Sequence, residues 1–460
     1  MGIMNFPLQE IDNRLKSGRI TVCVVGLGRI GLPTAATFAK AGAKVIGVDI
    51  DPKVVDMLNS GRCLFSDEPG LADLIAETVG EGKLRGTTNV SSAVSDSDVI
   101  IICVPTPVDE TKVPDYSSII KACEDIGASL KRGTLVLFES TVGPGTVESL
   151  LSPVLEKASG LGLGVDFEVA SCPERADPGR ILANLLEVTR VVGGLSQKAT
   201  KAASHLYKSA LGVIVVEVSN SKTANAVKLT ENLFRDVNIA LANEFAILYE
   251  KLGIDTIEVI KACSTKYNFM PHYPGAGVGG PCLPSNPYYL MIEGIKVGNI
   301  PFMVRLAREI NDRMPDHVVK LVTEALNDVN KTVRESKIAV LGVAYKPDIH
   351  DIQLTPIERI FKSLKALGAR VSIYDPMYKG EVVFGERVPQ DAYEAIEGAD
   401  CILIGTAHSE LKKVELTKIA KFCDMPAALV DTQNLFNPKN VKEAGFAFRG
   451  VGRPSLPNAE

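Results

Sequence analysis

The chain has 460 residues, which is too long for a single hydrophobic core and predicts roughly two to four domains. Hydrophobic residues make up 46% of it and charged residues 23%, as in soluble globular proteins. A net charge of -5 offers no basic surface for nucleic acid, and no apolar run approaches the ~18 residues that a membrane span needs. Nine scattered cysteines without a CxxC pair, behind a polar start that is no signal peptide, favour a reducing cytoplasm. The same cysteine pattern argues against a disulfide framework or a zinc site.

Short apolar runs alternate with helical segments in the first part of the chain. A helix is expected over residues 32–41, and this alternation predicts a parallel α/β sheet. The expected strands cover residues 20–25, 44–49, 99–104, 135–138 and 188–192.

A glycine motif stands between the first strand and the first helix, in the run Gly26-Leu27-Gly28-Arg29-Ile30-Gly31. Asp49 closes the second strand 18 residues after Gly31, and this context turns a weak GxGxxG pattern into a dinucleotide fingerprint. Gly26 is expected to make the tight turn, Gly28 to admit the pyrophosphate and Gly31 to let the helix pack closely. Asp49 would bind the ribose 2′-hydroxyl and repel a 2′-phosphate, which predicts NAD as the cofactor. A plain strand–turn–helix corner would show the same glycines without binding a nucleotide.

The middle of the chain is helical. Residues 219–253 contain almost no helix breakers and carry apolar residues at helical spacing, which predicts one long helix or two in line. The wide apolar face of this segment needs a partner, so we expect it to form the interface of a homodimer.

An α/β pattern then restarts in the last third. Its expected elements are strands at 337–342, 370–376, 401–405 and 428–431 and a helix at 356–367. The fold class is therefore α/β, with two Rossmann-like, doubly wound parallel-sheet domains joined by a helical domain. The expected divisions are an NAD-binding domain (1–205), a central helical domain with the dimer interface and a reactive cysteine (206–328), and a substrate domain (329–460).

One cysteine stands out by its setting. Cys282 follows the glycine run 275–280 and precedes a helix start at Ser285-Asn286-Pro287. Glycines let other atoms approach the backbone, and a helix N-terminus favours the thiolate form of a nearby thiol. The pattern indicates a nucleophile in a tight backbone pocket, although an inert cysteine beside an ordinary loop would share it.

Four further patches carry polar residues at the ends of expected strands or on the long helix. Loops 104–108, 139–146 and 171–175 each follow a strand, where ligand-binding loops lie. Lys228 and Asn232 are four residues apart and share a helix face. Taken singly, each of these patches could have no function, as a turn residue, a solvated charge or a polar helix face.

Together these residues resemble the UDP-sugar 6-dehydrogenase family over nearly the whole chain. The motifs Cys-Pro-Glu-Arg-x-x-Pro-Gly at 172–179 and Lys-Leu-Thr-Glu-Asn-x-Phe-Arg-Asp-Val-Asn-Ile-Ala at 228–240 are similar to the branch that acts on N-acetylated sugars. The resemblance implies a four-electron oxidation of the C6 hydroxyl of a UDP-N-acetylhexosamine, with UDP-N-acetylmannosamine favoured and NAD as oxidant. It implies that the aldehyde is trapped by Cys282 as a thiohemiacetal, oxidised to a thioester and hydrolysed to the uronic acid.

The resemblance also assigns roles to individual residues. Glu174 is implied as general base, Lys228 and Asn232 as stabilisers of the oxyanion, and Thr106 as a positioner of water and sugar. The catalytic set is Cys282, Lys228, Asn232, Glu174, Thr106 and Asn286. The cofactor set is Gly26, Gly28, Arg29, Ile30, Gly31, Asp49, Thr106 and Thr141. The substrate set is Glu174, Arg175, Lys228, Arg235, Asn238, Gly277, Gly279, Gly280, Tyr345 and Lys346, and no metal is expected.

The sequence departs from the family pattern around the substrate. Asn286 stands where the family has aspartate, Pro281 where the N-acetyl branch commonly has histidine, and Gln353 where an arginine is usual. These departures leave open a nucleotide-sugar-binding homologue with weak activity. The same chemistry on UDP-GlcNAc, UDP-GalNAc or UDP-glucose also stays open, as does a two-electron dehydrogenase of the 6-phosphogluconate or 3-hydroxyacid type.

Overall fold

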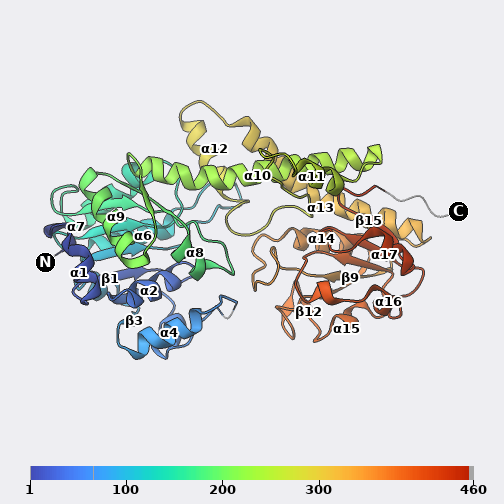
Figure 1. The fold of residues 1–460 in the computed structure, drawn as a ribbon, viewed down its shortest axis with the longest axis horizontal. Coiled ribbons are helices and arrows are strands. Elements are labelled where there is room, and N and C mark those ends of the chain that lie inside the picture. The colour runs from blue at the N-terminus through green and yellow to red at the C-terminus, as the bar shows by residue number, and fades with distance from the viewer. Residues whose placement is uncertain (1, 66, 455–460) are drawn as a thin grey trace. The chain divides into compact units, whose positions relative to one another are not determined.

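The computed structural model describes residues 2–65 and 67–454, and its chain divides into two compact units. The N-terminal unit comprises Met1–Glu231 and Tyr288–Ile300, and the C-terminal unit comprises Asn232–Pro287 and Pro301–Glu460 (Figure 1). The chain passes between them inside helix α10 (Ser221–Leu252) and near the start of α12 (Asn286–Lys296). The domain boundaries at residues 205 and 328 stay predictions.

Within the described residues, the N-terminal unit has an eight-stranded sheet in the order β3-β2-β1-β4-β5-β6-β7-β8. The first six strands are parallel and have the order of a doubly wound dinucleotide-binding sheet, which reverses between β1 and β4. The predicted parallel α/β fold is therefore confirmed. The strands are β1 (Thr21–Val25), β2 (Lys44–Val48), β3 (Leu84–Thr87), β4 (Val99–Ile102), β5 (Leu135–Phe138), β6 (Glu168–Ser171), β7 (Arg190–Gly194) and β8 (Val215–Glu217).

One strand differs in direction from the expectation. The strand predicted over 188–192 is β7, two residues later, and it runs antiparallel to β6. The connection over 172–189 carries only the short helix α8 (Ile181–Glu187). The chain therefore leaves β6 and enters β7 at the same edge of the sheet, which is the edge where the ligand-binding loops lie.

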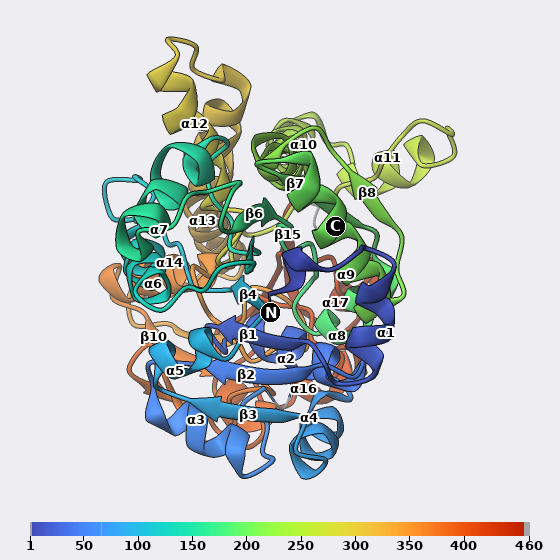
Figure 2. The ribbon, with the colours of Figure 1, turned by 90° about the vertical axis from the view of Figure 1, so that its left-hand side faces the viewer.

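Helices cover both faces of this sheet, as Figure 2 shows. One hydrophobic cluster joins the sheet to α1, α2 and α9, and a second joins it to α5, α6 and α7. The helices that precede α10 are α1 (Glu10–Lys16), α2 (Gly31–Lys40), α3 (Pro52–Asn59), α4 (Leu71–Gly80), α5 (Val90–Ser95), α6 (Ser117–Gly127), α7 (Ser152–Ser159), α8 and α9 (Gln197–Leu211), with the short 3₁₀-helix η1 (Ile3–Asn5) and the π-helix η2 (Val147–Leu151).

The long central helix is a single element. α10 contains neither glycine nor proline over its 32 residues. The side chain of Asn220 accepts the Thr223 amide at 2.8 Å, as a helix N-cap does, and Gly253 adopts φ +71° directly after the last turn.

Up to residue 454, the last that is described, the C-terminal unit repeats the doubly wound plan with a five-stranded parallel sheet in the order β10-β9-β13-β14-β15. The 27-residue helix α13 packs against it and was not predicted, because Pro315 lies inside it and reads as a helix breaker. The elements are α11 (Thr256–Cys263), α13 (Phe302–Asp328), β9 (Lys337–Leu341), α14 (Pro356–Ala366), β10 (Arg370–Tyr374), β11 (Val382–Val383), β12 (Glu386–Arg387), α15 (Ala392–Ile396), β13 (Cys401–Ile404), η3 (Leu411–Lys413), α16 (Leu416–Ile419), β14 (Ala428–Asp431), α17 (Pro438–Glu443) and β15 (Ala447–Gly450).

Two features are absent from the described residues. None of their helices combines the length and the hydrophobicity that crossing a bilayer requires. No three of their His, Cys, Asp and Glu side chains gather in a way that could hold a metal ion.

Candidate active site

The turn after β1 places three glycines in three environments. Gly26 has φ +92°, and a Cβ atom there would lie 2.8 Å from the Cys103 carbonyl oxygen. A Cβ at Gly31 would lie 1.8 Å from the Gly26 carbonyl oxygen, so only glycine lets α2 begin this close to the turn. A Cβ at Gly28 would meet no described atom within 4 Å. The position beside Gly28 is thus open at the N-terminus of α2, where a dinucleotide's pyrophosphate would bind.

Asp49 follows β2 and is half-buried. One of its carboxylate oxygens accepts the Leu27 amide at 2.9 Å and the other accepts the amide two residues further on at 3.0 Å. The carboxylate is thus fixed beside the glycine turn with part of its surface accessible, as a ribose-binding residue requires. Ile30 directly precedes α2, and the guanidinium of Arg29 forms a 2.9 Å ion pair with Asp67.

Two loops at the carboxyl edge of the sheet contact each other. The hydroxyl of Thr106, after β4, donates to the Thr141 carbonyl, after β5, at 2.7 Å. The Thr106 carbonyl in turn accepts from the hydroxyl of Tyr289 on α12. The Tyr116 hydroxyl accepts the Gly143 amide at 3.0 Å, and its ring lies edge-on to that of Tyr289. Sequence reasoning missed both tyrosines, although Tyr289 stands in the apolar stretch 288–292, where a tyrosine hydroxyl needs a partner.

Glu174 lies just beyond β6 and is only 8% exposed. Its amide donates to the Glu139 carbonyl at 3.2 Å, and its carboxylate accepts the Ala176 amide. Burial raises the pKa of Glu174 to about 7, although the positive charges of Lys228 and Arg190 lower it. A carboxyl group with a pKa near neutrality is suited to taking up a proton.

Arg175 turns to the surface of α10. Its guanidinium donates to Glu231 at 2.9 Å and also reaches the Thr189 carbonyl. Lys228, on the same helix, is buried with 7% of its surface exposed. Within the N-terminal unit the structure therefore brings Lys228 into electrostatic range of Glu174 and gives Arg175 other partners.

The remaining predicted residues of α10 belong to the C-terminal unit. The side-chain amide of Asn232 donates to the side-chain oxygen of Asn286 at 2.6 Å, and both residues are buried. Arg235 is exposed, and Asn238 bonds the Phe234 carbonyl of its own helix at 2.7 Å. Arg235 and Asn238 are thus separate from the Asn232–Asn286 contact.

The glycine run packs tightly in the same unit. Gly277 has φ +125°, and a Cβ there would lie 3.2 Å from the Asn311 carbonyl oxygen. Cβ atoms at Gly279 and Gly280 would each lie 2.7 Å from atoms of Tyr345, and the Gly280 amide donates to the Gln353 carbonyl at 2.9 Å. Tyr345 therefore rests directly on the glycine run, and Lys346 follows it in the loop after β9.

Cys282 is exposed and opens the turn that leads into α12. Its carbonyl oxygen accepts the Asn286 amide at 2.8 Å and the Ser285 amide at 3.2 Å. The thiol thus belongs to the residue that begins a helical turn, and Asn286 is the last residue of that turn.

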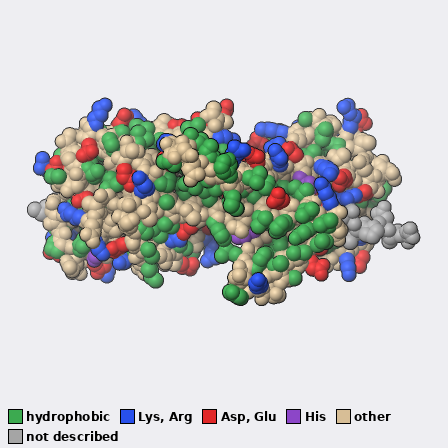
Figure 3. Space-filling model, turned by 90° about the horizontal axis from the view of Figure 1, so that it is seen from above, with side chains coloured by type: hydrophobic (Ala, Val, Ile, Leu, Met, Phe, Trp, Pro, Cys, Tyr) green, Lys and Arg blue, Asp and Glu red, His purple; other side chains and the backbone are tan. Residues whose placement is uncertain are grey.

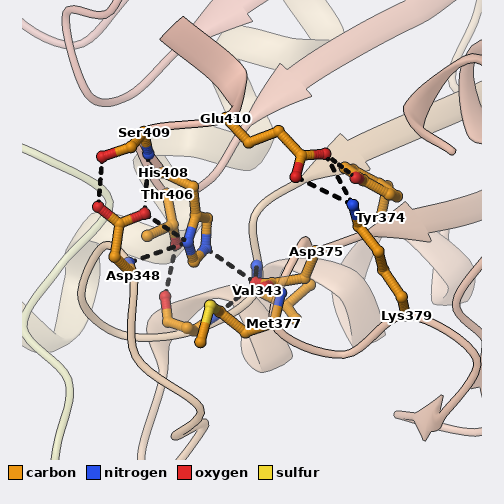
Figure 4. Close-up of polar contacts among 11 residues, drawn as sticks. Val343, Asp348, Tyr374, Asp375, Met377, Lys379, Thr406, His408, Ser409 and Glu410 are labelled. Atoms are coloured by element: carbon orange, nitrogen blue, oxygen red, sulfur yellow. Dashed lines mark hydrogen bonds and ion pairs between the residues drawn. The ribbon is translucent and has the colours of Figure 1, made fainter. Parts of the chain in front are cut away.

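The second sheet also carries an aspartate after its second strand, shown in Figure 4. Asp375 accepts the Val343 and Ala344 amides at 2.7 and 3.0 Å and the His408 Nε2–H at 3.0 Å. The Asp348 amide donates to His408 Nδ1 at 3.0 Å, so both ring nitrogens are engaged. Asp375 and His408 are fully buried, and the carboxylate has no surface to offer a ribose. In this respect Asp375 differs from Asp49, whose carboxylate keeps accessible surface beside the glycine turn.

A buried ion pair is the second feature that sequence reasoning missed. Arg190 donates to Glu139 at 2.9 Å, and the hydroxyl of Tyr207 donates to the same oxygen at 2.6 Å. A charged residue at each end of an otherwise apolar run is the signal that could have found the pair, because buried charges need opposite partners.

Family models match most of the chain. Three domain models of the UDP-glucose/GDP-mannose dehydrogenase family match it. They are the NAD binding domain over residues 20–211, the central domain over 222–313 and the UDP binding domain over 339–438. The predicted NAD cofactor is therefore confirmed.

Individual relatives extend the likeness to nearly full length. UDP-N-acetyl-D-mannosamine dehydrogenase of Pyrococcus horikoshii is 40% identical over 94% of this chain and 99% of its own. UDP-N-acetyl-D-glucosamine 6-dehydrogenase of Pseudomonas aeruginosa is 35% identical over 91% and 97%. The solved structure of the UDP-D-ManNAc dehydrogenase from P. horikoshii matches with a TM-score of 0.88 at 39% identity, covering 95% of this chain and all of that one. The chain belongs to the UDP-glucose/GDP-mannose dehydrogenase family and is an NAD-dependent UDP-sugar dehydrogenase.

Proposed function

We propose that this enzyme oxidises the C6 hydroxyl of a UDP-N-acetylhexosamine to the carboxylate by a four-electron reaction, with UDP-N-acetylmannosamine as the favoured sugar. The observation that carries the proposal is the exposed Cys282 at the start of a helical turn. Asn286 ends this turn and accepts a hydrogen bond from Asn232 on α10. The names of the relatives support an N-acetylated sugar, and the P. aeruginosa relative keeps UDP-GlcNAc as a second candidate.

The residues divide the work by their chemistry. NAD, which the Gly26–Gly31 turn and Asp49 would hold, would supply the hydride acceptor for both oxidations. After the first, the Cys282 thiolate adds to the C6 aldehyde, and the resulting alkoxide takes a proton to complete the thiohemiacetal. Loss of the C6 hydride and the hydroxyl proton then gives the thioester. Buried cationic and amide groups stabilise an oxyanion, and we assign this role to Lys228 and Asn232.

Hydrolysis of the thioester needs a base. We assign this role to Glu174, because a pKa of about 7 lets its carboxylate take a proton from water near neutral pH. Water adds to the thioester carbonyl, the C–S bond breaks, and the thiolate of Cys282 is regenerated. We assign Thr106, which is fixed by Thr141 and Tyr289, to the placement of the water and the sugar hydroxyl.

Counting NADH per sugar with UDP-ManNAc, UDP-GlcNAc, UDP-GalNAc and UDP-glucose tests the proposal. Two NADH per N-acetylated sugar are expected, with uronate as product. One NADH per sugar would indicate a two-electron dehydrogenase, and no NADH with intact UDP-sugar binding would indicate the weakly active homologue. Cys282→Ala should abolish uronate formation, and undiminished formation would rule out the covalent route.

We also propose that the enzyme is a cytoplasmic homodimer. Phe234, Leu241, Phe245, Leu248 and Leu252 project from one side of α10 and are 40–60% exposed. Figure 3, which views the molecule from above, shows hydrophobic side chains gathered on this face. Exposed apolar stripes of this kind mark association surfaces, and a second copy of the same helix offers a matching stripe.

A further inference from the structure

A buried ion pair lies next to the backbone of the Glu174 loop in the N-terminal unit. Glu139 directly follows β5 and Arg190 opens β7, with their side chains 0% and 3% exposed. One Glu139 oxygen accepts from Arg190 and Tyr207, and the other lies 3.4 Å from the hydroxyl of Thr34 and 3.7 Å from the thiol of Cys103. Every one of these neighbours donates, so the carboxylate is satisfied as an anion.

The pair holds the backbone on both sides of Pro173. Arg190 donates to the Cys172 carbonyl at 3.3 Å and to the Cys172 sulfur at 3.4 Å. Glu139 supplies the carbonyl that accepts the Glu174 amide at 3.2 Å. The residue before Pro173 is therefore held by the Arg190 side chain, and the residue after it by the backbone of Glu139, whose side chain pairs with Arg190.

The same carboxylate also reaches the cofactor side of the sheet. Thr34 lies in the first turn of α2, the helix that begins at the fingerprint glycine Gly31. Because a buried ion pair contributes little net stability compared with well-packed apolar residues, its presence here calls for another explanation. We infer that Glu139 and Arg190 are positioning residues, which hold the Cys172–Glu174 segment in register with α2 so that Glu174 can act. This inference rests on the role proposed for Glu174.

Charges from three elements face the Glu174 carboxyl. Arg190 on β7 and Lys228 on α10 lower its pKa, whereas Glu139 after β5 raises it, and burial is the largest raising influence. Burial also raises the pKa of the neighbouring Cys103 thiol well above its ordinary value, so that thiol stays neutral. Removing the charge of Glu139 should therefore make Glu174 more acidic.

The test has two parts, each run over a range of pH. Uronate release that follows the second NADH in a single turnover reports thioester hydrolysis, and steady-state kinetics give kcat and KM. Glu139→Gln keeps the shape and an accepting oxygen but removes the charge, so the acidic limb of the profile should move down by about one pH unit. Arg190→Lys keeps the charge but loses the contacts with Cys172, so kcat should fall about tenfold while KM for the UDP-sugar changes little.

A matched control is available in the other unit. Asp236 and Arg308 form a buried ion pair at 2.7 Å, between α10 and α13. Asp236→Asn removes a charge from a buried pair and should leave the acidic limb in place. If the Glu139 or Arg190 single variants do not fold, Glu139→Gln combined with Arg190→Met removes both charges together and should still lower kcat about tenfold.

The inference would be overturned if Glu139→Gln and Arg190→Lys both fold, and if the acidic limb of the pH profile and kcat stay as they are in the parent protein. Failure of the underlying proposal has a different signature, because Glu174→Gln would then hydrolyse the thioester at the parent rate. An inactive Glu174→Gln alongside unaffected Glu139 and Arg190 variants would remove only the positioning role.

Discussion

The side-chain amide of Asn232 donates a 2.6 Å hydrogen bond to the side-chain oxygen of Asn286, joining the long helix to the turn that Cys282 begins. Asn286 occupies the position where the family resemblance leads us to expect aspartate. The contact needs only an acceptor at residue 286, which asparagine supplies as well as aspartate does.

Substitutions of Asn286 separate hydrogen bonding from charge. Asn286→Asp should keep the bond and change turnover by less than about threefold. Asn286→Leu leaves the Asn232 amide buried and unpaired, which should cost about 1–3 kcal/mol in the free energy of unfolding and lower turnover at least tenfold. Steady-state kinetics and denaturant unfolding measure both. A large rise in turnover for Asn286→Asp would favour the weakly active homologue instead.

Asp49 should govern the choice between NAD and NADP. Its carboxylate is fixed beside the glycine turn, where it would repel a 2′-phosphate. Asp49→Ser should therefore shift the ratio of kcat/KM for NAD over NADP by at least about tenfold toward NADP. Asp51→Ser, two residues further along the chain, is the control, and an equal shift in both variants would contradict the assignment.

Glu174 links activity to stability. Its pKa is about 7 in the folded chain, against 4.5 for an ordinary glutamate, so the folded state binds the extra proton between these two pH values. The stabilising contribution is complete below pH 4.5 and is lost as the pH rises to about 7, a change on the order of 3 kcal/mol. Glu174→Gln should flatten this dependence and abolish the rise in thioester hydrolysis near pH 7. Thermal unfolding of both proteins across the pH range measures this dependence. A variant whose stability varies with pH as the parent's does would refute the link between Glu174 and stability.

The apolar side of α10 should decide the oligomeric state. Leu248→Glu places a charge in the stripe at a position that is 47% exposed, so the protomer should fold and the dimer should weaken. Lys320→Gln, on exposed α13 surface, is the control. Light scattering over a concentration series reports the mass, and a monomeric parent protein would contradict the proposal.

Local sequence signals were sufficient where one stretch of chain builds one feature. The turn from Gly26 to Gly31 and its aspartate were predicted because strand, turn, helix and second strand follow one another in the sequence. The long helix was predicted for the same reason, because α10 contains no glycine or proline from Ser221 to Leu252.

Features that depend on partners distant in sequence were not predictable. Glu139 and Arg190 are 51 residues apart, and neither residue by itself indicates which charge it will meet. The reversed direction of β7 depends on where the 172–189 connection lies in space. Pro315 reads as a breaker, yet α13 continues through it because the packing of the rest of the helix outweighs the lost hydrogen bond.

The buried hydrogen bond between Asp375 and His408 bears on the number of NAD molecules that one chain binds. Both sheets carry an aspartate after their second strand, but only Asp49 keeps an accessible carboxylate. One chain should accordingly saturate with a single NAD in a binding titration. Under the four-electron reaction, the two oxidations must then draw on one pocket in succession. On the proposed mechanism, reduced cofactor would have to leave and oxidised cofactor enter between them, and the bond to Cys282 would retain the half-oxidised sugar during this exchange.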